Sequence, residues 1–323
     1  MLSVIAPGAW ASPATYADHP QARAFVDRVS AEHGIESAFL EKLFEQARYQ
    51  QSIVDAMNRP AERVKEWKDY RKIFLTSKRL RQGVKFWQDH RATLEKAQSE
   101  YGVPVEIIVA ILGVETYYGR VTGGYRVIDA LSTLAFDYPK RSAFFTRELE
   151  HFLLLTREQN LDPLTLTGSY AGAMGFGQFM PSSYRSYAVD FTGDGVADIW
   201  RDASDAIGSV ANYFARHGWQ SGGDIVAPAQ WQGAVDDLPF NQLAKPDLTL
   251  AQLAEAGLHP VAEGFPKERK AIPLRLVGDG GDEFWLGFDN FYVVTRYNHS
   301  FRYAMAVVQL SEQLAARVNG IAP

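Results

Sequence analysis

Glu115 is the residue of this sequence whose surroundings best suit acid catalysis. It lies in the stretch GVPVEIIVAILGVETYYGR, residues 102–120, which is apolar on nearly every side of a helix. Pro104 suits the first helical position and Gly119 suits the residue just past the end, so Glu115 falls in the last turn. Burial and the negative end of a helix both raise the pKa of a carboxyl. A carboxyl that stays neutral near pH 7 is what a general acid requires.

A structural role for Glu115 is the alternative. A glutamate near a helix end can extend its carboxyl to solvent, or it can pair with Arg120 one turn on. A single acid in an apolar helix is more often structural than catalytic, so the assignment depends on the neighbouring motifs.

The composition excludes several classes of protein. Of the 323 residues, 46% are hydrophobic and 22% are charged, as in ordinary globular proteins, and the net charge of -5 gives no electrostatic footprint for nucleic acid. The absence of cysteine excludes disulfides and thiolate sites, and no apolar run is long enough to span a membrane. The basic run of residues 78–81, KRLR, is interpreted as the solvated face of a helix. The start of the chain resembles the end of a secretory signal, with a cleavage-like Ala9-Trp10-Ala11, or is disordered.

A glycine-rich stretch, GSYAGAMGFGQFMPSSY, covers residues 168–184. Glycines interleaved with large apolar side chains indicate that the backbone approaches something closely, rather than a flexible linker. A ligand wall and a tight helix crossing both fit this pattern. A phosphate loop does not, because no Gly-Lys-Ser/Thr ending and no preceding strand are present.

The stretch DFTGDGVADIWRDASD has the spacing of a calcium loop. Its oxygen donors occupy positions 1, 3, 5, 7 and 9 of an EF-hand-like loop, with a glycine at position 6: Asp190, Thr192, Asp194, the Val196 carbonyl, Asp198 and Gly195. Position 12 is Arg201 rather than glutamate, so Asp202 or Asp205 would have to close the shell. The alternative is an aspartate- and glycine-rich turn that caps the helix expected over residues 206–217.

The hydrophobic periodicity predicts a mainly α (α+β) protein. Residues 20–101 are helical throughout, with one long segment from Ser77, and residues 128–155 form two helices divided at 138–141. Period-2 segments at 272–277, 284–286 and 291–294, with a turn at 278–281, predict a small antiparallel sheet, and a helix follows over 300–318. We therefore expect a signal remnant or disordered start (1–19), a helical domain (20–100), a catalytic core (101–225), a β domain (226–290) and a C-terminal helix that returns to the core (291–323).

The remaining chemistry points to sugars. The seven histidines form no HExxH pair, and the sequence contains neither a GxSxG elbow nor a dinucleotide fingerprint. What remains is a protected carboxyl beside a glycine and aromatic wall. Such walls suit pyranose rings, whose C–H faces pack on aromatic side chains.

Four ordered motifs resemble the lytic murein transglycosylases of the membrane-bound B type and their soluble relatives. They are ETYYGR from Glu115, GAMGFGQFMPSSY from Gly172, SVANYF from Ser209 and RYN from Arg296. The resemblance covers residues 70–306, most of the chain. It implies a lysozyme-like core with a helical N-terminal domain and a small β domain.

The resemblance also implies the reaction, which is cleavage of the β-1,4 bond between N-acetylmuramic acid and N-acetylglucosamine in peptidoglycan without water. Glu115 would protonate the glycosidic oxygen, and the 2-acetamido group of the substrate would trap the cationic centre in place of a second carboxylate. Glu115 would then take the proton of the C6 hydroxyl as that hydroxyl attacks C1. The product carries a 1,6-anhydromuramoyl end.

Further site residues are carried over by motif position. The sugar-binding residues so implied are Tyr70, Tyr117, Arg141, Ser169, Met174, Gln178, Tyr213, Tyr297 and Asn298. Phe144 stands where close relatives have a tyrosine, which removes one hydrogen bond. The structural calcium site so implied comprises Asp190, Thr192, Asp194, Val196 and Asp205, with an extra residue before Asp205 that leaves Asp202 as the alternative closing ligand. No organic cofactor is implied.

The resemblance implies a periplasmic protein that binds peptidoglycan glycan strands, with other cell-wall enzymes as further partners. It would be an outer-membrane lipoprotein if a lipidated cysteine lay upstream. Two other functions stay open. A murein or chitin hydrolase would need a second carboxylate, for which Asp129 and Asp137 are the nearby acids. An inactive wall-binding module would bind sacculi without releasing fragments.

Overall fold

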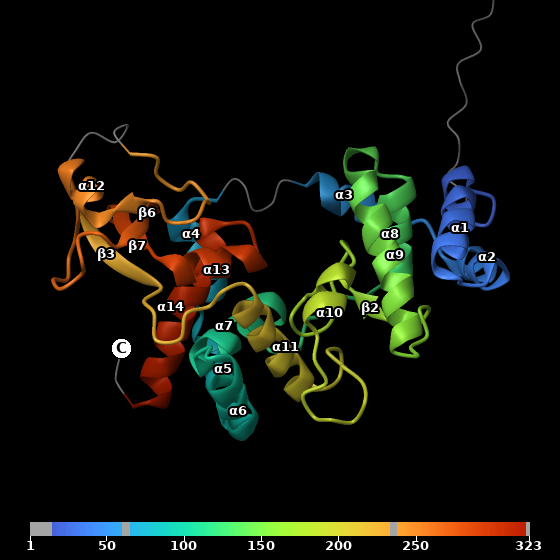
Figure 1. The fold of residues 1–323 in the computed structure, drawn as a ribbon, viewed down its shortest axis with the longest axis horizontal. Helices are drawn as coiled ribbons and strands as arrows, with labels where there is room; N and C mark the ends of the chain where they lie inside the picture. The colour runs from blue at the N-terminus through green and yellow to red at the C-terminus, as the bar shows by residue number, and fades with distance from the viewer. Residues whose placement is uncertain (1–14, 60–64, 233–237, 321–323) are drawn as a thin grey trace, which may run out of the picture. The chain divides into compact units, whose positions relative to one another are not determined.

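A computed structural model describes residues 15–59, 65–232 and 238–320 (Figure 1). The signal-like start therefore lies outside the described residues. Backbone contacts divide the described chain into two compact units. The first unit comprises residues 15–59, 123–174 and 178–185, and the second comprises 65–122, 175–177 and 186–320. The ranges expected as a helical domain and as a catalytic core thus each contribute to both units.

The first unit is built around a buried helix, α8 (Val127–Phe136), every residue of which is buried. It packs against α9 and α3, and α1 also contacts it. The other elements of this unit are α1 (Pro20–His33), α2 (Ser37–Gln46), α3 (Gln51–Asn58), η1 (Pro139–Arg141), α9 (Ser142–Glu158), α10 (Pro181–Tyr187), β1 (Tyr125–Arg126) and β2 (Thr167–Gly168). Strands β1 and β2 pair antiparallel, which places the glycine-rich stretch directly after β2.

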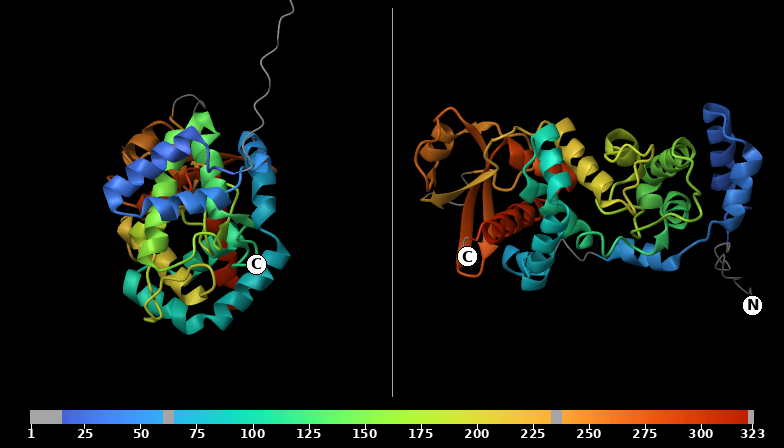
Figure 2. Two further views of the ribbon diagram at one scale, coloured as in Figure 1. Left: turned by 90° about the vertical axis from the view of Figure 1, so that its right-hand side faces the viewer. Right: turned by 90° about the horizontal axis from the view of Figure 1, so that it is seen from below.

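The second unit encloses the apolar helix that carries Glu115, α7 (Val105–Thr116). Helices α14, α5, α6 and α11 contact it, and Figures 1 and 2 show α14, coloured red, beside these helices. Enclosure from several sides explains why α7 lacks a polar face. The surrounding helices are α4 (Trp67–Phe74), α5 (Ser77–Asp89), α6 (Arg91–Tyr101), α11 (Ala203–Arg216), α13 (Asp289–Tyr297) and α14 (Phe301–Val318).

The predicted small sheet is present in the second unit. Its strand order is β4-β6-β7-β3-β5, and all neighbours pair antiparallel. The β6/β7 hairpin turns at Asp279-Gly280, as the glycine-rich run predicted. The elements are β3 (Val226–Trp231), β4 (Leu248–Thr249), α12 (Leu250–Glu255), β5 (Leu258–Pro260), β6 (Lys270–Gly278) and β7 (Gly281–Gly287).

Two secondary-structure predictions were wrong. Residues 291–294 form part of helix α13 rather than a strand, because a short apolar run fits either element and here continues the spacing of buried Asn290, Phe291 and Val294. The long segment from Ser77 divides at His90 into α5 and α6. Among the described helices, none alone is long and apolar enough to cross a membrane, and the pair α6 and α7 passes that test only if joined across a bend of 113°.

Candidate active site

Glu115 lies in the last turn of α7, as predicted, but its surroundings differ from the expected ones. It is half-buried, whereas the fully buried acids of the described chain are Asp129, Glu148 and Asp205. Pro104 caps α7 at its N-terminus instead of starting it, and the helix ends at Thr116. The side chain of Glu115 is therefore partly reachable from outside the core, which a residue that acts on a polymer requires.

The chain leaves α7 through three consecutive residues in the left-handed region. The φ angles are 57° at Tyr117, 63° at Tyr118 and 78° at Gly119. Left-handed backbone is uncommon outside glycine and is kept where the surrounding structure enforces it. The Tyr118 amide donates to the Leu112 carbonyl at 2.9 Å, which closes the helix end. Gly119 predicted a helix end, but the two tyrosines before it gave no sign of this conformation.

Thr116 joins this turn to the glycine-rich stretch. Its hydroxyl accepts a hydrogen bond from the Gly119 amide at 2.9 Å and donates to the Phe176 carbonyl at 2.7 Å. The Phe176 amide donates in turn to the Ile199 carbonyl at 2.9 Å. Residues 175–177 are thus fixed to the residue directly after Glu115. This supports the interpretation that the glycines allow close backbone approach.

Tyr303 contacts the candidate acid directly. Its hydroxyl donates to Glu115 Oε1 at 2.6 Å from the first turn of α14. Burial raises the pKa of the Tyr303 hydroxyl well above its usual value, and the nearby Glu115 carboxylate raises it further, so the hydroxyl stays protonated and remains a donor. Sequence analysis missed this residue. Its only sequence signal is its place one helical turn into the apolar helix that follows the RYN motif.

Three further predicted residues lie in the same tyrosine cluster. The Tyr297 hydroxyl donates to the Gly177 carbonyl at 2.6 Å, and burial followed by the Glu115 charge raises its pKa well above the usual value. Tyr213 packs on Tyr297 with ring centroids 4.8 Å apart. Tyr70 is buried and close enough to Tyr303 to raise the pKa of that hydroxyl. The second unit therefore gathers Glu115 with four tyrosines.

Tyr117 and Asn298 have different surroundings. The Arg79 guanidinium lies 4.7 Å from the centroid of the Tyr117 ring. Asn298 is exposed at the C-terminus of α13, and its carbonyl accepts a hydrogen bond from the Ser300 amide at 2.7 Å. The Asn298 side chain is thus left to face outward.

The other predicted sugar-binding residues belong to the first unit. The Ser169 hydroxyl accepts from the amides of Ala173 at 3.1 Å and Ala171 at 3.3 Å, so it shapes its own loop. Gln178 has a left-handed φ of 52°, and Arg141 is exposed with its guanidinium 4.4 Å from the Phe144 ring centroid. Met174 is fully buried, and its part in sugar binding stays a prediction.

Asp129 and Asp137, the acids considered for a second catalytic carboxylate, hold structural partners in the first unit. Asp129 is buried, pairs with Arg126 at 2.8 Å and accepts the Arg48 amide at 2.8 Å. Asp137 accepts the Tyr16 hydroxyl at 2.7 Å. Both carboxylates are thus committed to tertiary hydrogen bonds.

The calcium-like loop has its carboxylates gathered. Asp190, Asp194 and Asp205 each offer an oxygen within 4.8 Å of the others. Asp205 is fully buried on α11 and accepts the amides of Phe191 at 2.8 Å and Asp198 at 2.8 Å. Burial raises the pKa of the Asp205 carboxyl, and these amides partly offset that rise. A nearby cation would favour the ionised form, so the donor set fits a hard divalent ion.

The competing ligand Asp202 has another role. Its carboxylate accepts the Ser204 amide at 2.6 Å and caps the N-terminus of α11. The capping that sequence analysis considered as an alternative to calcium binding is therefore present, but it is made by a residue outside the three-carboxylate cluster.

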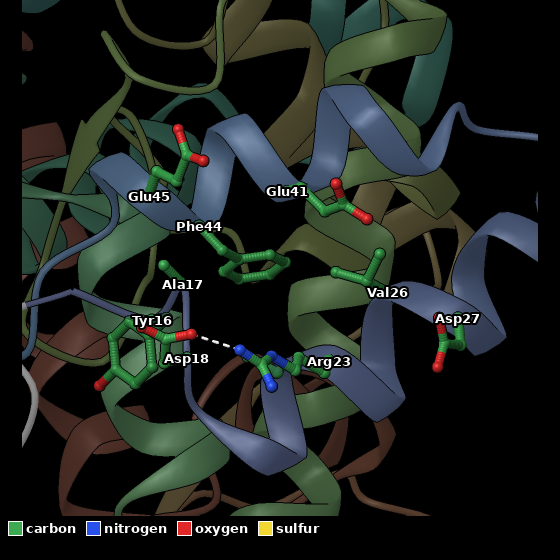
Figure 3. Close-up of a pocket in the computed structure, with 10 residues that line it drawn as sticks. Tyr16, Ala17, Asp18, Arg23, Val26, Asp27, Glu41, Phe44 and Glu45 are labelled. Atoms are coloured by element: carbon green, nitrogen blue, oxygen red, sulfur yellow. Dashed lines mark hydrogen bonds and ion pairs between the residues drawn. The ribbon is translucent and has the colours of Figure 1, made fainter.

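A pocket in the first unit contains none of the predicted site residues. Figure 3 shows this cavity of about 500 Å³ between α1 and α2, where Arg23 is turned toward Asp18 and the wall is otherwise acidic and apolar. Glu115 and its tyrosines belong to the second unit. A larger cavity of about 660 Å³, lined by Phe39 and Leu153 among others, likewise contains none of the predicted site residues.

Gly175 tests whether the glycine-rich stretch requires close approach. Its φ is +66°, and a Cβ there would lie 2.4 Å from the Ile199 carbonyl oxygen. We expect Gly175→Ala to lower the free energy of unfolding by about 2–4 kcal/mol, from left-handed strain plus the backbone clash. Gly222→Ala is the matched control, since Gly222 has a φ of +71° with no atom within 4 Å and should show only the strain, about 1 kcal/mol. If urea unfolding showed equal losses of stability in Gly175→Ala and Gly222→Ala, the close approach of the Gly175 backbone to the Ile199 carbonyl would be contradicted.

Comparisons with known proteins identify a matching family model and a similar protein. The family model of the transglycosylase SLT domain matches residues 17–312. Membrane-bound lytic murein transglycosylase B of Escherichia coli (strain K12) is 46% identical over 313 residues, which is 94% of this chain and 85% of that protein.

Two of the solved structures that resemble this chain are lytic transglycosylases or their relatives. The Escherichia coli lytic transglycosylase Slt35 in complex with calcium is 45% identical, with a TM-score of 0.87 over 94% of this chain and 95% of that one. SltB3 from Pseudomonas aeruginosa in complex with NAG-anhNAM-pentapeptide is 29% identical, with a TM-score of 0.81 over 91% and 78%. The predicted lysozyme-like, mainly helical fold is confirmed.

Proposed function

The chain belongs to the transglycosylase SLT domain family and is a lytic transglycosylase that acts on peptidoglycan, and we propose that Glu115 is the single acid and base of its reaction. The observation that carries the proposal is the hydrogen bond from Tyr303 to Glu115 in the last turn of the apolar helix α7. One carboxyl held by a neutral donor among tyrosines suits proton transfer to a sugar oxygen.

In the proposed reaction the Glu115 carboxyl gives its proton to the glycosidic oxygen as the C1–O4 bond of the muramic acid unit breaks. The acetamido oxygen of that sugar bonds to C1. The Glu115 carboxylate then takes the proton of the C6 hydroxyl, whose oxygen attacks C1 and displaces the acetamido oxygen. Glu115 ends protonated, no water is consumed, and the product is a 1,6-anhydro ring. The NAG-anhNAM-pentapeptide in the SltB3 structure supports this product.

A single carboxylate is favoured over a hydrolytic pair. Asp129 and Asp137 are held by structural hydrogen bonds, whereas the Glu115 charge raises the pKa of both Tyr297 and Tyr303. A hydrolase would need a second carboxylate to position water. An inactive wall-binding module is disfavoured because Glu115 and its hydrogen-bonded tyrosine are both present.

We propose that the sugar contacts of the second unit come from Tyr70, Tyr213 and Tyr297 beside Glu115, and from Tyr117 and Asn298 on the segments that follow α7 and α13. Arg141, Ser169 and Gln178, which belong to the first unit, stay predicted sugar-binding residues. Met174 would support the loop from beneath, since it is buried.

Mass spectrometry of the soluble products from purified sacculi tests the proposed reaction. Fragments with anhydro ends are expected. Reducing ends would assign a hydrolase with a second carboxylate, and binding to sacculi without fragments would assign a wall-binding module.

Tyr303→Phe is expected to lower kcat by about 10–100-fold, because a hydrogen bond to a charged group contributes roughly 1.5–3 kcal/mol. The donor favours the ionised form of Glu115, so its loss raises the pKa of that carboxyl, and the limb of the pH profile that reports its ionisation moves to higher pH. Tyr101→Phe, the same change in the half-buried Tyr101 of α6, should leave the profile in place. An unmoved profile with near-normal kcat would show that Tyr303 only fills space.

We propose that Asp190, Thr192, Asp194, Val196 and Asp205 bind a structural calcium ion. The carboxylate cluster and the calcium complex of Slt35 support the proposal. Calcium at 100-fold its Kd would stabilise the fold by about 2.7 kcal/mol, raising the Tm of chelator-treated protein by about 5 °C. Asp190→Asn should abolish the rise. A Tm that ignores both calcium and chelator would refute the site.

We propose that the protein acts at the cell wall in the periplasm, on peptidoglycan glycan strands. The name of the Escherichia coli relative, a membrane-bound murein transglycosylase, supports this location. Other cell-wall enzymes as partners stay a prediction.

A further inference from the structure

Lys78 and Arg79 both lie against the ring of Tyr117, two residues after Glu115. The Arg79 guanidinium lies 4.7 Å from the Tyr117 ring centroid, and the Lys78 ammonium lies 5.9 Å from it. The two cations come from the first turn of α5, which packs against α7 (Figure 1). Sequence analysis interpreted this basic run as a solvated helix face. That interpretation holds for Arg81, which is exposed, but not for Arg79, which is half-buried.

The Arg79 side chain has backbone and aromatic partners but no carboxylate partner among the described residues. Its Nη1 donates to the Ile73 carbonyl, and its guanidinium lies 5.2 Å from the Phe74 ring centroid. Arg71, Arg126 and Arg275 are also half-buried, and each pairs with a carboxylate. Across the described ranges no acid pairs with Arg79 or Lys78, and Arg79 Nε is buried without a hydrogen-bond partner. Burial also lowers the pKa of Arg79. Each cation is attracted to the ring face, and the two together leave a local positive charge that an anion can approach.

We propose that Lys78 and Arg79 bind a carboxylate of the substrate beside Tyr117, and that this carboxylate belongs to the stem peptide of the glycan strand. The inference rests on the proposed function, because it is the position of Tyr117 after the catalytic acid that places the subsite. The guanidinium can bind a carboxylate through two parallel hydrogen bonds, while the lysine supplies a mobile point charge. A stem peptide carries such carboxylates, whereas a glycan stripped of peptides retains only the lactyl carboxylate on each muramic acid.

Initial rates on two substrates test the subsite: glycan strands that carry stem peptides, and the same strands after an amidase has removed the peptides. Arg79→Gln is expected to raise KM about tenfold on the peptide-bearing strands, with kcat kept and KM on stripped strands within twofold. Lys78→Gln should give a smaller rise of the same kind. Arg79→Lys should recover part of the affinity, and Arg81→Gln removes an equal charge from the same helix as the control.

The outcomes are distinct. A rise in KM confined to the stripped strands would retain carboxylate binding but assign it to the lactyl group, which is a free carboxylate only where the peptide has been removed. An equal rise on both substrates would show a contact with the glycan itself and would overturn the subsite. A fall in kcat on both substrates, or unchanged KM in both single variants, would overturn the subsite and leave Arg79 as a packing residue for Tyr117. Lys78 is exposed, so its variant stays informative even if Arg79→Gln fails to fold. Wild-type protein that releases no anhydro ends from either substrate would instead refute the proposed function.

Discussion

Glu115→Gln is expected to release no anhydro-ended fragments from sacculi, with a rate at least about 10³-fold below that of the wild type. Glutamine keeps the size and can still accept the Tyr303 hydrogen bond, but it can neither give a proton to the glycosidic oxygen nor take one from the C6 hydroxyl. Because one residue performs both transfers, no partner can compensate. Mass spectrometry of the soluble products, with rates from their peak areas, is the measurement.

Glu106→Gln provides the matched control. Glu106 lies in the first turn of the same helix and is also half-buried. Glu106→Gln therefore removes the same charge from the same helix but leaves the proposed catalytic acid in place. Its rate should stay within about threefold of the wild type, as expected for a surface substitution. Substantial activity in Glu115→Gln would assign the proton transfers to another acid, and equal losses in both variants would indicate damage to α7.

Asp205→Asn is expected to lower the free energy of unfolding by about 2–4 kcal/mol. One carboxylate oxygen accepts the amides of Phe191 at 2.8 Å and Thr192 at 3.2 Å, and the other accepts the amide of Asp198 at 2.8 Å. The side-chain NH2 group of an asparagine would face one or two of these backbone N–H groups, so two donors would meet without an acceptor inside a fully buried site. Urea unfolding in chelator measures this loss without any contribution from calcium.

Asp202→Asn separates the two candidate closing residues of the loop. Asparagine caps a helix about as well as aspartate, so this variant should unfold within about 0.5 kcal/mol of the wild type. It should also keep its response to calcium, because Asp202 lies outside the carboxylate cluster. A lost calcium response in Asp202→Asn, with a normal response in Asp205→Asn, would reverse the assignment.

Local patterns predicted the parts of the site that depend on neighbouring residues. The all-round apolar spacing of α7 indicated its enclosure, and alternate oxygen donors indicated the loop from Asp190. The run at 291–294 was misassigned because four apolar residues fit a strand and a buried helix equally well, and only the packing of α13 decides between them.

Long-range contacts were beyond such patterns. Tyr303 is separated from Glu115 by 188 positions, and nothing in the apolar spacing of α14 distinguishes its hydroxyl from a core aromatic ring. The burial of Glu115 was also overestimated, because helical periodicity cannot show where the last turn of a helix emerges from the core.

The route of the chain between its two units limits how the protein can be divided. The chain passes from one unit to the other at residues 59, 122, 174, 177 and 185. No single cut therefore yields either whole unit as a separate polypeptide, and a cut at 122, 174 or 177 leaves parts of both units on each side. A fusion that carries the whole unit with Glu115 must also carry residues 123–174 and 178–185 of the other unit.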